Sequence, residues 1–132
     1  MIRAVLFDFW DTIVFAERQE SEKLRRLRIS SLTNALIDAG FPVSSETVER
    51  TVDKINTECD KIRKTGQEVD LHNQVRMLME LLGIKGQNRN LSQRLWSAYA
   101  SAVFSIELKV RDGTEAVLLS LREARALRNW QK

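Results

Sequence analysis

The sequence predicts a predominantly α-helical protein, a helical bundle with minimal sheet. Gly and Pro are scarce, with five and one among 132 residues, which is typical of long helices joined by few turns. Five stretches repeat apolar residues at the three- and four-residue spacing of a helix face. A single apolar run, Ile2 to Phe7, has the length and the β-branched and aromatic content of a buried strand. We therefore expect one strand followed by five helices.

The first two expected helices have clear boundaries. The first runs from about Glu17 to Ala39 and stops at Gly40, ahead of Pro42, because Gly favours a helix C-terminus and Pro cannot continue the helix. Either Ser44 or Ser45 can cap the second, because a serine hydroxyl accepts a hydrogen bond from a free backbone N–H in the first turn.

The remaining three helices are marked in the same way. The third is expected from about Asp70 to Leu82, with Gly83 at its end. Asn90 and Gln93 have the spacing of a capping box and predict the start of the fourth. The fifth is expected from about Thr114 to Leu127. The helices between residues 17 and 108 can bury their apolar stripes together as a four-helix bundle.

Composition excludes several classes of protein. The net charge is +3, and bases alternate with acids along most of the chain, so we expect mainly solvated helix faces, with nucleic-acid binding as a minor, disfavoured alternative. No apolar run approaches the ~18 residues of a membrane span, so no membrane partner is expected. One cysteine, Cys59, excludes an intrachain disulfide and is compatible with the cytoplasm, which is the expected location.

Acidic and hydroxyl side chains follow the apolar run directly. Asp8 comes first, and Asp11 and Thr12 follow. A continuous apolar run is typical of a strand buried on both faces of a parallel sheet. Ligands of open α/β sheets bind beyond the carboxyl ends of such strands. Asp8 is therefore a candidate nucleophile or metal ligand.

This stretch, Leu6 to Val14, resembles the first motif of the haloacid dehalogenase-like (HAD) hydrolase superfamily, an apolar strand ending in Asp-x-Asp-Gly-Thr-Leu/Val. Later segments resemble the landmarks of a helical C1-type cap and of the return into the core: residues 36–41, 81–84 and 110–116. The resemblance implies α/β ancestry with a Rossmannoid first strand. It assigns residues 1–16 to the core strand and first motif, 17–108 to the helical cap, and 109–132 to the start of the return.

The resemblance also implies a chemistry. In such enzymes the first Asp, here Asp8, attacks the substrate and forms a phospho-aspartyl or ester intermediate. Mg²⁺ is held by that carboxylate and by the backbone carbonyl two residues on, here that of Trp10. Thr12 matches the residue that supports the motif loop. The implied substrate is a small phosphorylated or halogenated compound.

Two departures from the motif affect that chemistry. Trp10 stands where phosphatases of the superfamily have a second Asp, and an indole cannot exchange the catalytic proton. Asp11 lies one residue later, at the usual Gly position, and is a second candidate for proton transfer. The dehalogenase branch resembles this sequence in having an aromatic residue in place of the second Asp. That branch also uses a cap arginine, to which no residue here is assigned.

The later motifs of the superfamily, a Ser/Thr, a Lys and an acidic pair, do not occur before Lys132. We therefore expect a truncated HAD-like fragment that is inactive alone. The alternative is a non-catalytic module for self-association or partner binding, because an unpaired strand edge invites another chain. The strand Ile2 to Phe7 has three possible locations: across the helices, against its copy in a homodimer, or in a rudimentary sheet with Leu108 to Val110.

Overall fold

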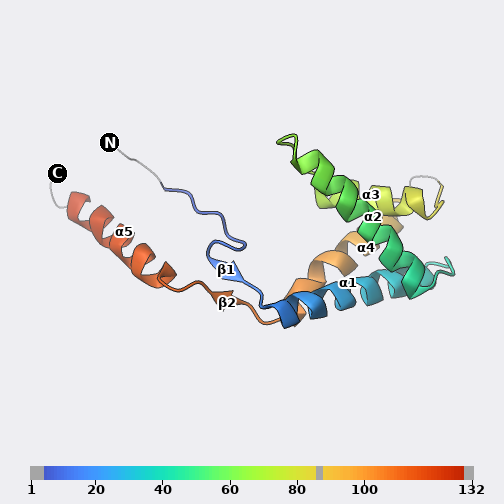
Figure 1. The fold of residues 1–132 in the computed structure, drawn as a ribbon, viewed down its shortest axis with the longest axis horizontal. Coiled ribbons are helices and arrows are strands. Elements are labelled where there is room, and N and C mark those ends of the chain that lie inside the picture. Colours follow the sequence, from blue (N-terminus) through green and yellow to red (C-terminus); the bar gives the residue numbers. More distant parts are fainter. Residues whose placement is uncertain (1–4, 86–87, 130–132) are drawn as a thin grey trace. The chain divides into compact units, whose positions relative to one another are not determined.

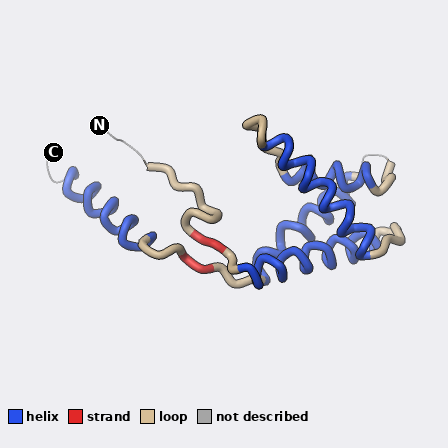
Figure 2. Tube along the Cα trace, viewed as in Figure 1, coloured by secondary structure: helices blue, strands red, loops and turns tan. Residues whose placement is uncertain are grey.

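Helices dominate the computed structural model, which describes residues 5–85 and 88–129 (Figures 1 and 2). Within these residues the elements in chain order are β1 (Val14–Phe15), α1 (Arg18–Asp38), α2 (Ser45–Arg63), α3 (Leu71–Leu81), α4 (Arg89–Ser101), a 3₁₀ helix (Ala102–Ser105), β2 (Lys109–Val110) and α5 (Thr114–Asn129). The predominantly helical fold with minimal sheet is thereby confirmed. No helix in the described part is long and apolar enough to cross a membrane.

Side-chain caps determine where three of the helices begin. The Ser44 hydroxyl accepts from the Thr47 N–H at 3.2 Å at the start of α2. The Asp70 carboxylate accepts from the Asn73 N–H at 2.8 Å at the start of α3, and this bond lowers the pKa of Asp70. The capping box expected at Asn90 is wrong, because Asn88 caps α4 instead.

The chain divides into two compact units. The helical unit comprises Glu22–Ile106, and the sheet unit comprises Met1–Ser21 with Glu107–Lys132. Helix α1 begins in the sheet unit and continues in the helical unit.

The helical unit contains the hydrophobic core. Helices α1, α2, α3 and α4 each contribute apolar side chains to one cluster, as a bundle requires. Its buried members are Ile29, Leu32, Leu36, Val48, Val52, Ile55, Cys59, Val75, Leu78, Met79, Ile84, Leu91 and Leu95. Burial raises the pKa of the Cys59 thiol, which therefore packs as an apolar group.

An ion-pair network also connects α1 to α2. The guanidinium of Arg25 donates to a carboxylate oxygen of Glu49 at 2.6 Å and to both of Asp53 at 2.8 and 2.9 Å. All three side chains are exposed, so the network contributes little to the stability of the fold.

In the sheet unit, β1 and β2 form an antiparallel pair, with Val14 opposite Val110 and Phe15 opposite Lys109. The strand expected over Ile2 to Phe7 is not found where it can be tested: Val5, Leu6 and Phe7 belong to no strand, and Leu6 is 95% exposed. Residues 2–4 lie outside the described residues. A buried strand needs neighbours on both sides, and the described β2 pairs with β1 instead. A rudimentary sheet near Leu108 to Val110 was one of the three locations considered for Ile2 to Phe7, but Val14 and Phe15 occupy that place and pair with Val110 and Lys109.

Candidate functional site

The residues of the predicted motif form a tight loop that leads into β1. The N–H groups of Ile13 and Val14 both donate to the carbonyl of Phe9, at 3.0 and 3.1 Å. The N–H of Asp11 donates back to the carbonyl of Val14 at 2.7 Å. These three bonds close the segment from Phe9 to Val14, which we call the motif loop.

Asp8 immediately precedes the motif loop and is exposed. One of its carboxylate oxygens accepts from the Phe9 N–H at 2.9 Å, and the other accepts from the Thr12 hydroxyl at 3.4 Å. Both carboxylate oxygens of Asp8 therefore have a hydrogen-bond donor beside them. The structure therefore brings Asp8 and Thr12 together.

Asp11 adopts a left-handed backbone conformation with a φ of 58°. This region favours Gly, although Asp tolerates it better than most residues. The HAD-like motif that this stretch resembles has Gly at the position of Asp11. The backbone of the loop thus has the conformation that a glycine there would adopt, with an aspartate in its place.

Arg111, which follows β2 directly, binds the motif loop. The sequence alone did not predict this contact. The N–H of Arg111 donates to the carbonyl of Ile13 at 2.8 Å, and its Nε donates to the carbonyl of Asp11 at 3.2 Å. Its guanidinium also lies 4.7 Å from the centre of the Phe15 ring. Arg111 follows Asp11 by 100 residues, so only the pairing of β1 with β2 brings the two together.

Two further contacts join the same parts of the sheet unit. Lys109 Nζ lies 2.6 Å from a carboxylate oxygen of Glu17, and this hydrogen bond raises the pKa of Lys109. The N–H of Glu107 donates to the Glu20 carboxylate at 2.9 Å. The first turn of α1 and the residue before it are therefore bonded to the segment that lies between the 3₁₀ helix and α5.

The described residues do not by themselves fit a Mg²⁺ site. The ion prefers about six oxygen ligands in octahedral geometry. No group of three or more His, Cys, Asp or Glu side chains suited to a metal occurs in the part of the chain that the structure describes. Asp8 and the backbone carbonyl of Trp10 supply only part of the ligand set that the resemblance implies.

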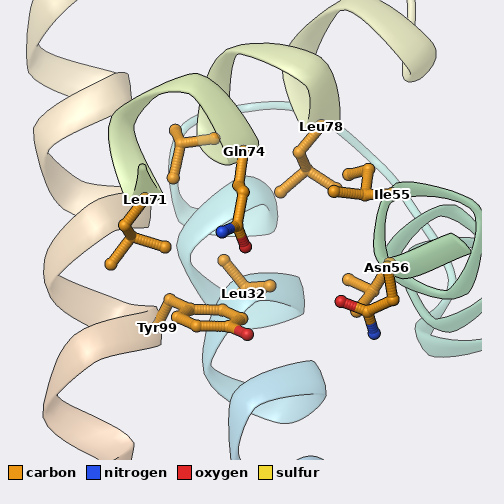
Figure 3. Close-up of a pocket in the computed structure, with 9 residues that line it drawn as sticks. Leu32, Ile55, Asn56, Leu71, Gln74, Leu78 and Tyr99 are labelled. Carbon is orange, nitrogen blue, oxygen red and sulfur yellow. The ribbon is translucent and has the colours of Figure 1, made fainter. Parts of the chain in front are cut away.

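A separate small cavity lies in the helical unit (Figure 3). It is lined by Leu32, Val52, Ile55, Asn56, Leu71, Gln74, Val75, Leu78 and Tyr99. Its volume of about 20 Å³ is sufficient for a single water molecule and not for a substrate. The side-chain nitrogen of Gln74 donates to the Val69 carbonyl at 2.8 Å, so this donor has a partner. We regard this cavity as a packing feature.

Comparison with known proteins adds no family assignment. No protein-family model matches the chain, and searches of the curated proteins and of the solved structures also give no match.

Proposed function

We propose that this chain carries the nucleophile loop and the helical cap of a HAD-like hydrolase, with Asp8 as the nucleophile. One observation supports the proposal above the others. The segments on either side of the helices pair as β1 and β2, and Arg111 binds the motif loop from the second segment. The chain thus leaves and rejoins the sheet unit at adjacent positions, which is the geometry that a cap inserted after the first motif requires.

In this proposal a carboxylate oxygen of Asp8 attacks the phosphorus of a phosphate ester or the carbon that carries a halogen. Attack at phosphorus forms an acyl phosphate, and the alcohol leaves. Attack at carbon forms an aspartyl ester, and the halide leaves. Water then hydrolyses the intermediate and restores the Asp8 carboxylate. Trp10 cannot transfer the proton that an alcohol leaving group needs, so Asp11 is the candidate within the loop.

The Ser/Thr, the Lys and the acidic pair that complete such a site do not occur within these 132 residues. Without them the negative charge of the reacting phosphate is not neutralised, and the Mg²⁺ ligand set is incomplete. We therefore expect these residues alone to have no turnover. Activity requires the missing groups from additional polypeptide.

The test begins with the nucleotide sequence beyond codon 132, read in all three frames for the missing motifs. A product that carries them is then produced together with this chain and assayed with Mg²⁺ on p-nitrophenyl phosphate and on 2-chloropropionate. Halide release alone would indicate the dehalogenase-like chemistry, and phosphate release the phosphatase-like chemistry. Asp8→Asn should abolish turnover, whereas Asp112→Asn, a matched change at an exposed residue outside the motif loop, should not. The absence of such a frame, or turnover that survives Asp8→Asn, contradicts the proposal.

A second candidate function is a non-catalytic module for self-association or partner binding. It is favoured by the distribution of exposed apolar side chains. Most of the large apolar residues that are exposed belong to the sheet unit: Val5, Leu6, Phe7, Phe9, Trp10, Val110, Val117, Leu118, Leu119 and Leu121. Contiguous exposed apolar surface often marks an interaction site. Sedimentation velocity tests this candidate. A chain that sediments as a monomer, both alone and mixed with candidate partner proteins, contradicts it.

A further inference from the structure

Helix α5 exposes an apolar stripe along one face. Val117, Leu118 and Leu121 follow one another at helical spacing and are 48%, 45% and 37% exposed. Every described side chain from Glu115 to Ala124 is exposed. Solvated helices usually bury such a stripe against another element. Within the described residues of the sheet unit, no other element covers this stripe.

The rest of the sheet unit offers no core to which α5 could contribute. Among its described apolar residues only Val14 is buried, and its sheet is a single two-stranded pair. An isolated two-stranded sheet is marginally stable in water. The sheet unit therefore needs another surface to bury its apolar side chains.

The charged residues beside the stripe indicate which kind of surface could cover it. Glu115 and Arg122 are seven residues apart, so they lie on the same face of α5, along the edge next to Leu118. Acidic and basic residues are equally numerous in the sequence of the sheet unit, eight of each. A unit without net charge does not repel its own copy.

We propose that a second copy of this chain covers the stripe, with the two α5 helices packed antiparallel about a two-fold axis. In that arrangement Leu118 of each copy meets Leu121 of the other. The edge that carries Glu115 and Arg122 meets the same edge of the other copy, so Glu115 faces Arg122 in both directions. A parallel pair would place this edge against the opposite edge of the other helix, so Glu115 and Arg122 would not face each other. The inference rests on the association candidate above and is independent of the hydrolase proposal.

Charge exchange on the full chain tests this pairing. Glu115→Arg places two arginines opposite each other, and Arg122→Glu places two glutamates there. Each change alone should weaken self-association at least about tenfold, since opposed like charges at an interface are costly. The double variant Glu115→Arg with Arg122→Glu should associate like the original chain. An equimolar mixture of the two single variants should form a heterodimer, because both cross-pairs are then opposite in sign.

Sedimentation velocity at tens of micromolar measures these outcomes, and far-ultraviolet circular dichroism checks that each variant stays helical. A dimer for the original chain, monomers for the single variants and a dimer for their mixture support the pairing. A monomeric original chain overturns both the pairing and self-association. A dimer that all variants retain overturns the α5 pairing alone. Neither result depends on Asp8, so the hydrolase proposal is tested separately.

Discussion

Asp11 is the residue at which the backbone of the motif loop departs most from ordinary geometry. Its φ of 58° lies in the left-handed region, and it is the only residue other than Gly in the described part of the chain with a positive φ. The N–H of Asp11 is also one of the three donors that close the loop. The conformation is therefore maintained by hydrogen bonds on both sides of a residue that prefers other regions.

Replacing Asp11 by Gly should stabilise the closed loop by up to about 1 kcal/mol, because Gly adopts the left-handed region without steric cost. Asp11→Val should have the opposite effect, since β-branched residues are the least tolerant of that region. Amide hydrogen exchange at Ile13 and Val14, whose N–H groups donate to Phe9, measures both changes. Equal protection of these amides from exchange in the two variants would show that the stability of the loop does not depend on the left-handed conformation of residue 11.

At this scale the sequence was informative only where the residues are neighbours. Asp8, Asp11 and Thr12 lie within five positions, so a motif can identify them together. Arg111 contacts the same loop from 100 residues away through a backbone carbonyl, which has no signature in the sequence. A contact of this kind depends on how two distant segments pair, and composition and spacing do not encode it locally.

At the scale of elements, α2 shows how a single hydroxyl determines a helix boundary. Both Ser44 and Ser45 were candidates for its cap, because serine is favoured at that position. The structure selects Ser44, whose hydroxyl bonds the Thr47 N–H, and Ser45 is the first residue of the helix.

The two serines provide a matched pair of variants. Ser44→Ala should lower the free energy of unfolding by about 1 kcal/mol, because the Thr47 N–H loses its partner. Ser45→Ala should change it little, since Ala is at least as good as Ser within a helix. Urea denaturation followed by circular dichroism compares the two. A larger loss for Ser45→Ala would reverse the assignment of the cap.

The helices could be predicted well, and the strand could not, for one physical reason. A helix satisfies its backbone within a few residues, so apolar spacing, caps and Gly indicate it locally. A strand is satisfied only by another strand, and the run that includes Val5 to Phe7 has none among the described residues. Apolar content alone predicted burial there, but the described part of the chain supplies no neighbouring strands.

For the molecule as a whole, the unequal distribution of the core is the main feature. All buried apolar residues of the described chain except Val14 lie in the helical unit. Hydrophobic burial is the main favourable term in folding, so the two units must differ greatly in intrinsic stability.

A fragment of residues 22–106 should therefore unfold cooperatively on heating, at nearly the temperature of the full chain. Leu95 is fully buried, and Leu95→Ala should lower the free energy of unfolding by about 2–5 kcal/mol in both. Leu118→Ala in the full chain, at an exposed position, is the control and should leave the transition of the helical unit unchanged. Differential scanning calorimetry records these transitions. A fragment without a cooperative transition would mean that its core depends on the sheet unit.

The pairing of β1 with β2 also has an evolutionary consequence. Phe15 and Lys109 are partners in this pair, so the two points where the chain departs for the helices and returns from them are adjacent. Segments whose ends are close can be inserted into, or removed from, a host fold with little disturbance. The helices from α1 to α4 therefore form one segment that could be removed or replaced while the short pair of strands that joins its ends is kept.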